Sequence, residues 1–407
     1  MSSNNLVILL IILVASFAQS NVIKLYGDDN LDTVDGCLFK GCDCVTKNSS
    51  SGVIYWIDCV IPSGNTSTPD LFPERDDSST FSKSINTLLF NNNDFSTVPD
   101  DSFKDLTVQD MFFANNNLTK LGANSFRGIK FLNTLAMDEQ KLEEFESGSL
   151  APIYPYLTSF FLLNSPLDEN KFNEIFKEIK NCQNLKTLSI ANNSLKSLAE
   201  NQFDGLGKLE LLMITNNQLK SIDKNAFAKN TALKSLTLSE NEFDDISVVL
   251  EAAEPLQSNL ISIDLSANKI SDLNLKSSVD LNQLNTLYLS SNQIKKFDKT
   301  SLNGLENLRS LSLAGNQIDA IENDRLDDFQ NLYFLNLGNN FMSTVPKIFH
   351  LMSLTFLGLS NQNGKLTKLP DYAFERFSYG IFPLEIQLDQ NSITEIGPQA
   401  FCSRDMV

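Results

Sequence analysis

Six cysteines and one histidine are the residues of this 407-residue chain whose chemistry could define a site. Four of the cysteines lie close together, at Cys37, Cys42, Cys44 and Cys59. An even cluster of this kind forms two disulfide bonds in an oxidising compartment, or holds a zinc ion. Zinc sites usually combine paired C-x-x-C spacings with histidine, and the cluster has neither, so we expect disulfides. Spacing leaves all three possible pairings open.

No sequence pattern indicates catalysis or a bound cofactor. The single histidine, His350, has no neighbour in the sequence that marks the nucleophile of a Ser-His-Asp or Cys-His arrangement. Phosphate-binding glycine loops, dinucleotide-binding motifs and metalloprotease motifs do not occur. The acidic run at residues 28–32 lacks the glycine that a calcium-binding EF-hand loop needs. We therefore expect a protein without enzyme activity, cofactor or metal ion.

Repeats make up most of the chain and must position any binding residues. Residues 284–345 contain three copies of the pattern apolar-x-x-apolar-x-apolar-x-x-Asn-x-apolar, with asparagines 24 residues apart. The pattern recurs at 13 positions, ten of them asparagine, with a mean step of about 25 residues. These ladder positions are Asn93, Asn116, Gln140, Ser165, Asn193, Asn217, Asn241, Asn268, Asn292, Asn316, Asn340, Gln362 and Asn391. The period is typical of a leucine-rich repeat solenoid, an α/β fold whose turns must stack to bury their apolar edges.

The predicted architecture is a horseshoe over residues 84–401, with about 13 short strands forming a curved parallel sheet on its concave face. The ladder asparagine should bond backbone groups where the chain bends away from each strand. Longer steps with apolar residues at helical spacing predict convex-side helices at residues 169–180 and 245–254. Large apolar residues ten positions after the ladder residue predict a buried spine. They are Phe103, Phe126, Leu150, Phe203, Phe227, Leu302, Leu326 and Phe401.

The cysteine cluster resembles the N-terminal cap of extracellular animal leucine-rich repeat proteins, with residues 42–44 as the family's C-x-C. The resemblance implies the pairs Cys37–Cys44 and Cys42–Cys59. It extends over residues 37–401 and implies protein recognition without naming a ligand. A narrower similarity, to the non-catalytic subunit of shrimp luciferase and related arthropod proteins, rests on this cap, on residues 396–401 and on the missing C-terminal cysteine cap. It implies an accessory subunit.

The N-terminal sequence predicts secretion. Residues 6–17 are apolar and Ala18-Gln19-Ser20 follows, so residues 1–20 read as a signal peptide too short to span a membrane. Residues 21–83 should then form the disulfide cap and an exposed loop, and residues 402–407 a short tail. Cys182 is expected to be free and buried, and we predict no disulfide partner for Cys402. Four N-x-S/T sequons predict glycans, at Asn48, Asn65, Asn117 and Asn192.

The chain is acidic, with 32 Lys and Arg against 50 Asp and Glu, a net charge of −18. This charge disfavours nucleic acid and anionic membranes as partners, because both attract positively charged surfaces. Two explanations stay open. The acidic surface keeps a long solenoid soluble, or it serves a basic partner or a bound cation.

Aromatic and other large apolar residues at outward strand positions are the candidate binding residues. Exposed aromatic side chains on a rigid sheet are common anchors of protein interfaces. They fall into a cap-side pair and a C-terminal group, and the full set is Phe112, Phe161, Leu211, Met213, Tyr288, Tyr333, Phe334 and Phe356. Alternatively, these rings pack only against neighbouring strands. The sequence therefore predicts a module that binds a protein ligand through its concave face, or an accessory subunit of a secreted complex, in an unspecified oligomeric state.

Overall fold

The computed structural model describes residues 32–33, 36–49, 52–59, 72–275, 279–322, 325–375 and 383–402. The chain divides into two compact units, Met1–Leu195 and Lys196–Val407. Among the described residues, no helix has the length and apolar character needed to cross a membrane.

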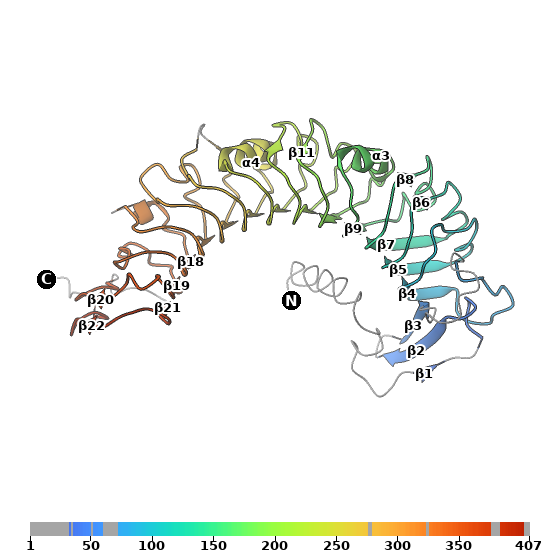
Figure 1. The fold of residues 1–407 in the computed structure, drawn as a ribbon, viewed down its shortest axis with the longest axis horizontal. Coiled ribbons are helices and arrows are strands. Elements are labelled where there is room, and N and C mark those ends of the chain that lie inside the picture. The colour runs from blue at the N-terminus through green and yellow to red at the C-terminus, as the bar shows by residue number, and fades with distance from the viewer. Residues whose placement is uncertain are drawn as a thin grey trace. The chain divides into compact units, whose positions relative to one another are not determined.

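The first unit starts with an antiparallel hairpin and continues as a parallel sheet (Figure 1). Strand β1 (Asp32–Thr33) pairs with β2 (Asp43–Ser49), and β2 pairs with β3 (Gly52–Cys59), all antiparallel. Strand β3 then runs parallel to the first repeat strand. The repeat strands of this unit are β4 (Ser84–Asn91), β5 (Thr107–Ala114), β7 (Phe131–Asp138), β9 (Ser159–Leu163) and β10 (Thr187–Ala191). The two-residue strands β6 (Lys120–Leu121) and β8 (Glu144–Phe145) pair with each other on the outer side of the coil.

The second unit contains eight further repeat strands in one parallel order. They are β12 (Leu211–Met213), β14 (Ser235–Thr237), β15 (Ser262–Asp264), β16 (Thr286–Tyr288), β17 (Ser310–Ser312), β18 (Phe334–Asn336), β19 (Phe356–Gly358) and β21 (Glu385–Gln387). Two short parallel pairs lie outside this sheet, β11 (Ser197–Leu198) with β13 (Ser221–Ile222) and β20 (Lys368–Leu369) with β22 (Glu395–Ile396). The described residues of the two units thus contain 13 repeat strands, which confirms the predicted leucine-rich repeat solenoid.

Every repeat strand ends in the same backbone bend. The residue directly before each of the 13 ladder positions has a positive φ, for example 57° at Asn92, 68° at Gly315 and 55° at Asn339. Glycine and asparagine adopt this left-handed conformation at the lowest cost, and seven of the 13 residues are asparagine. The bend turns the chain off the strand and brings the ladder side chain inward.

The ladder side chains bond backbone groups at the bend, as predicted, and they also connect neighbouring turns. The Asn316 amide nitrogen donates to Leu289 O of the preceding turn and to Leu313 O of its own, both at 2.9 Å. Its amide oxygen accepts a 3.0 Å bond from Ile294 N. The longer Gln362 side chain donates to Leu337 O of the preceding turn and accepts from Met342 N. The Ser165 hydroxyl donates to Leu163 O of its own turn at 3.0 Å. A buried amide at this position therefore satisfies three backbone groups that the bend leaves without sheet partners.

Both predicted helices form, on the side of the coil opposite the strands (Figure 1). Helix α3 (Glu169–Ile179) starts at Asp168, whose side chain accepts a bond from Lys171 N, and buries Phe172, Ile175, Phe176 and Ile179. Helix α4 (Ile246–Ala253) is capped by Asp245 and continues into the 3-10 helix η1 (Glu254–Leu256). A second 3-10 helix, η2 (Arg325–Asp328), lies near the C-terminal turns.

The spine is buried except at its last member. Phe103 stacks on Phe126 at 5.5 Å between ring centroids, and Phe203 on Phe227 at 5.7 Å, in each case within one unit. Phe401 is 62% exposed, which corrects its predicted burial. Its ring stacks on Phe374 at 5.2 Å, and no turn among the described residues covers its other side.

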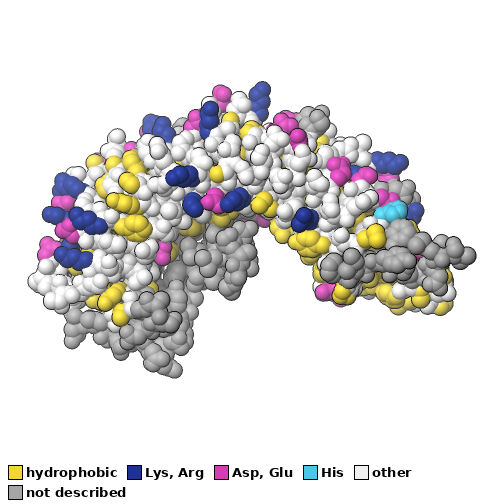
Figure 2. Space-filling model, turned by 180° about the vertical axis from the view of Figure 1, so that it is seen from behind, with side chains coloured by type: hydrophobic (Ala, Val, Ile, Leu, Met, Phe, Trp, Pro, Cys, Tyr) yellow, Lys and Arg dark blue, Asp and Glu magenta, His cyan; other side chains and the backbone are white. Residues whose placement is uncertain are grey.

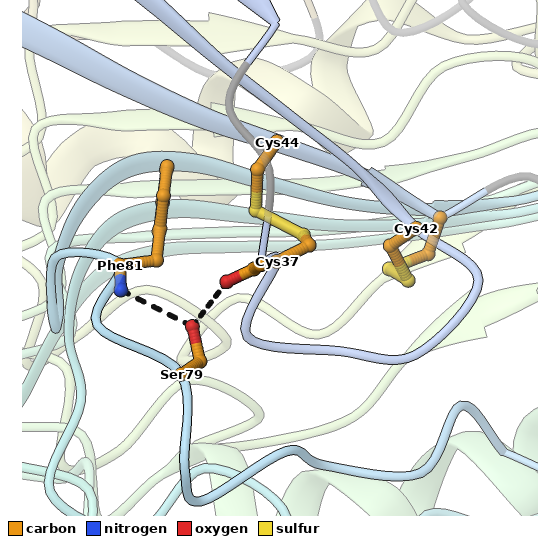
Figure 3. Close-up of a disulfide and its surroundings, with 7 residues drawn as sticks. Cys37, Cys42, Cys44, Ser79 and Phe81 are labelled. Carbon is orange, nitrogen blue, oxygen red and sulfur yellow. Dashed lines mark hydrogen bonds between the residues drawn. A yellow bond between two sulfur atoms is a disulfide. The ribbon is translucent and has the colours of Figure 1, made fainter.

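The N-terminal cap closes the first turn. Its disulfides are Cys37–Cys44 and Cys42–Cys59, which confirms the pairing that the resemblance implied. The Ser79 hydroxyl donates to the Gly36 carbonyl beside the first disulfide and accepts a 3.1 Å bond from Phe81 N (Figure 3). Within residues 72–83, Phe72 is buried and lies 4.8 Å from the Phe90 ring. This end of the predicted exposed loop is therefore part of the core. The Phe72 ring is buried there because packing against Phe90 removes its apolar area from water.

Candidate functional site

The sheet register aligns the strand-centre residues into one row in each unit, as the repeat pattern predicts. In the first unit the row is Leu89, Phe112, Ala136, Phe161 and Ser189. In the second it is Met213, Thr237, Asp264, Tyr288, Ser312, Asn336, Gly358 and Gln387. Within each unit, the strands form the concave side of the coil (Figure 1), so these rows and the alternate positions beside them form its concave face.

An aromatic cluster lies on the concave face of the second unit. Phe334 and Phe356 occupy paired positions on β18 and β19, and their rings stack at 4.6 Å with an interplanar angle of 8°. Both side chains are partly exposed, and Tyr333 beside them is 47% exposed. Such a group combines apolar area with low side-chain freedom, which favours binding. We call Tyr333, Phe334 and Phe356 the aromatic patch.

Gly358 makes room for the aromatic patch. A Cβ at this position would lie 2.5 Å from Asn336 Oδ1 and 3.3 Å from Cε1 of Phe356. The Asn336 oxygen accepts a 3.0 Å bond from Gly338 N, so it is not free to move away. The absence of a side chain on Gly358 therefore lets the Phe356 ring settle against the sheet.

The other candidates of the second unit do not join this patch. Tyr288 is 37% exposed but lies two strands and two residues from Phe334, a Cα distance of about 12 Å. Leu211 is half-buried on β12, five strand intervals from β18. Of the predicted C-terminal group, the structure thus brings Phe334 and Phe356 into contact, with the exposed Tyr333 directly before Phe334.

Three predicted binding residues are buried, contrary to their expected exposure. Phe112 is 7%, Phe161 1% and Met213 6% exposed. The two phenylalanines flank the small Ala136 in one row. Their low exposure agrees with the packing interpretation, and binding by these residues stays a prediction.

Several polar residues that the sequence did not single out lie beside the cap-side row. Asp58 continues it on β3, and Asp110 and Asp138 lie two residues away on either side. Burial raises the pKa of all three carboxyls, and the nearby Asp43 carboxylate contributes at Asp58, whose pKa rises to about 6. Aligning the strands by their repeat pattern would have placed these acids on the concave face.

The outer charges, by contrast, are paired. Lys, Arg, Asp and Glu side chains lie interspersed over the outer surface of each unit (Figure 2). Lys130 lies 3.1 Å from Asp105 in the first unit, and Lys269 lies 3.0 Å from Glu242 in the second. Exposed pairs of this kind contribute little stability but keep the surface mixed in sign.

The remaining predicted sites are placed as follows. Asn117 is partly exposed and Asn192 exposed, each beside its ladder residue; Asn48 lies on β2, and Asn65 falls outside the described residues. Cys182 is free and buried, as expected, and Cys402 is free and exposed. On the surface, His350 Nδ1 lies 2.8 Å from Asp327 Oδ1. No group of three or more potential metal ligands occurs among the described residues.

Family models identify the repeats. The leucine rich repeat model matches residues 167–219, 183–243, 258–318 and 283–342, and the BspA type leucine rich repeat region model matches residues 77–175. These matches cover more than half of the chain, which therefore belongs to the leucine-rich repeat proteins. Members of this family are generally non-enzymatic interaction scaffolds, and no catalytic family is indicated. No curated protein matches the sequence.

Solved structures share the fold. A leucine-rich repeat protein of Leptospira interrogans is 25% identical with a TM-score of 0.51, covering 78% of this chain and 80% of that one. A chain in the octameric complex of Latrophilin 3, Unc5D and FLRT2 is 19% identical with a TM-score of 0.56, covering 73% and 84%. A chain of the TLR13–ssRNA13 complex is 23% identical with a TM-score of 0.54 and covers 75% of this chain. This chain spans only 40% of the TLR13 chain.

Proposed function

We propose that this chain is a secreted, non-enzymatic binding module that recognises a protein ligand through its concave face. The aromatic patch carries the proposal. Its two stacked phenylalanine rings and its exposed tyrosine lie on a rigid parallel sheet, where little side-chain entropy remains to be lost on binding.

The two disulfides support secretion, since such bonds persist in oxidising compartments. The structural neighbours include a member of a complex of several proteins and one bound to RNA. For this chain a protein ligand is favoured over RNA, because its net charge of −18 opposes a phosphate backbone. The predicted glycans at Asn117 and Asn192 would lie at the rim of the concave face and restrict where a ligand docks.

An accessory subunit of a secreted complex is the second candidate. The apolar centre row of the first unit favours it over the mostly polar row of the second, because a subunit can hold its partner through the first unit and leave the second free. Both functions require a protein partner, so they differ in which surface that partner covers.

The test is a pull-down from the source fluid with recombinant residues 21–407 and with the Phe334→Asp, Phe356→Asp double variant. If these phenylalanines anchor the ligand, replacing both by aspartate should weaken the binding free energy by about 2 kcal/mol or more, which is roughly 30-fold in affinity. Ile261→Asp is the matched control, since Ile261 is 42% exposed and directly precedes β15 as Tyr333 precedes β18.

Loss of one partner from the folded double variant, but not from the control, supports recognition through the aromatic patch. Unchanged capture by the double variant contradicts it and favours the accessory role.

A further inference from the structure

Two charged side chains flank the aromatic patch. Arg309 directly precedes β17, and its carbonyl oxygen accepts bonds from Tyr333 N at 2.9 Å and from Phe334 N at 3.1 Å. Glu385 is the first residue of β21, where it is paired with Phe356 in the sheet register. The sheet therefore holds a cation beside one edge of the patch and a carboxylate beside the other.

Both charges are accessible and lack an ion-pair partner. Arg309 and Glu385 are exposed, as is Tyr333 beside Arg309. Among the residues that the structure describes, neither charged side chain forms an ion pair. The Glu385 carboxylate accepts a 3.1 Å bond from the neutral side-chain amide of Gln387, which leaves its charge unmatched.

The other charges at equivalent positions are bonded within the second unit. The positions compared are the residue directly before each repeat strand, the first strand residue and the centre row. The other charged residues there are Glu210, Lys234 and Asp264. Lys234 Nζ lies 2.5 Å from Glu210 Oε2, and the Asp264 side chain accepts a 2.8 Å bond from Ser266 N. Within the described part of these rows, the charges without a charged or backbone partner are therefore the two beside the aromatic patch.

This combination of side chains suits a protein ligand with a defined charge pattern. Arginine and aromatic residues are enriched among the residues that dominate the affinity of protein interfaces. The Arg309 guanidinium presents planar donors that can serve both oxygens of one carboxylate. Apolar ligand side chains on the aromatic patch would exclude water from that pair and strengthen it. The same ligand would cover Glu385, which then requires a cation from the ligand.

The spacing of the two charges defines the length of the ligand segment. Arg309 lies three strand intervals and one residue from Glu385, which corresponds to about 15 Å between Cα atoms. In an extended chain, residues four apart are separated by about 13 Å and residues five apart by about 17 Å. A segment that crosses the strands from β17 to β21 would thus reach both charges and place the residues between them on the aromatic patch.

Building on the proposed function, we propose that the ligand segment bound by the aromatic patch carries an acidic residue for Arg309, apolar residues for the rings and a basic residue for Glu385. The acidic and the basic residue are four or five positions apart in an extended segment. Their order sets the direction of the segment, because the acidic residue must lie over β17 and the basic residue over β21.

The experiment uses the chain secreted into culture medium, which by the sequence prediction begins at Asn21. A library of random 12-residue peptides is selected on this chain. Enriched peptides are synthesised if the Phe334→Asp, Phe356→Asp variant no longer binds them. Their dissociation constants are measured by fluorescence anisotropy on the wild type and on three single variants, each verified as folded by circular dichroism. These variants are Arg309→Glu, Glu385→Lys and Lys234→Glu.

Lys234→Glu is the matched control for Arg309→Glu. Lys234 is exposed and directly precedes β14 as Arg309 precedes β17, and the two substitutions change the net charge equally. The two positions are three strand intervals apart, or about 14 Å. We expect enriched peptides with the acidic and basic pair around apolar residues. Arg309→Glu should weaken their binding at least about tenfold, and the control less than about twofold.

Exchanged charges give a readout that a damaged patch cannot produce. A peptide whose acidic residue is replaced by lysine should bind Arg309→Glu at least about tenfold more tightly than the wild type. A peptide whose basic residue is replaced by glutamate should show the same preference for Glu385→Lys over the wild type.

Four results would overturn the proposal: no enriched peptide, enriched peptides without the acidic and basic pair, an equal effect of Arg309→Glu and Lys234→Glu, or no preference of the exchanged peptides. Enriched peptides that all still bind the Phe334→Asp, Phe356→Asp variant would contradict the aromatic patch itself as well. By contrast, binding that is lost in that double variant but is insensitive to the charge variants overturns this inference alone and leaves the proposed function standing.

Discussion

The concave faces of the two units are built from the same repeat but differ in polarity and in the exposure of their side chains. In the first unit the centre row is apolar and buried, and polar atoms without partners lie beside it. In the second unit the centre row is mostly polar, and Tyr288 within it is 37% exposed. The repeat pattern constrains the residues that face the core, while the outward positions vary freely. The same repeat therefore carries two concave faces that differ in polarity and exposure.

The largest expected difference concerns a buried charge. Phe161→Asp in the first unit should lower the free energy of unfolding by about 3–5 kcal/mol, because a 1% exposed ring is replaced by an unpaired carboxylate. Phe356→Asp in the second unit should cost about 1 kcal/mol, since that side chain is partly exposed. Urea denaturation measures both. Equal losses would show that the two faces do not differ in burial.

The next effect depends on pH. The pKa of Asp58 rises from 3.8 to about 6 on folding, so between these values the native state keeps a proton that the unfolded state loses. This group therefore lowers stability progressively as the pH rises from about 4 to about 6, and fully above that range. Asp58→Asn should stabilise the protein by about 1–3 kcal/mol at pH 7 and very little at pH 4.

The same substitution at Asp264, whose side-chain oxygen accepts a bond from Ser266 N, should give no comparable gain at pH 7. Thermal unfolding at the two pH values provides the measurement. A stabilisation by Asp58→Asn that is as large at pH 4 as at pH 7 would disprove the assigned cause.

The smallest effect concerns the support of the aromatic patch. Gly358→Ala should weaken ligand binding about three- to tenfold, because the added Cβ meets Asn336 Oδ1 and the Phe356 ring. Gly338→Ala is milder, as the nearest atom to its Cβ would be Asn336 Oδ1 at 3.3 Å. Titration of the captured partner compares the two variants. A greater loss for Gly338→Ala would refute the role given to Gly358.

The scaffold could be predicted from the sequence because it depends on local, periodic signals. The ladder residues, the helices α3 and α4 and the buried Cys182 all follow from repeat spacing and from apolar residues at helical intervals. The disulfide pairing required a resemblance, since three pairings fit the spacing equally. The positive φ before every ladder residue was missed, because residues as different as Asn339 and Ala267 adopt it.

The candidate sites were only partly predictable. The pattern identified which residues point outward, but exposure depends on what their neighbours cover, and this distinguishes Phe112 from Tyr333. The pattern also overlooked Asp110 and Asp138, because the burial of an acidic residue on a strand becomes evident only when adjacent strands are aligned. Stacking of Phe334 on Phe356 likewise depends on the gap left by Gly358. Cleavage after Ser20 and glycosylation at the four sequons remain predictions.

Site-specific photo-crosslinking tests the central claim, recognition through the concave face, most directly. A photoreactive phenylalanine analogue is placed at Tyr333 in one preparation and at the exposed Lys299, on the side away from the sheet, in another. Both are irradiated in the source fluid, and crosslinked partners are identified by mass spectrometry. We expect one partner to be crosslinked from Tyr333 and not from Lys299. A partner crosslinked from Lys299 but not from Tyr333 would contradict it.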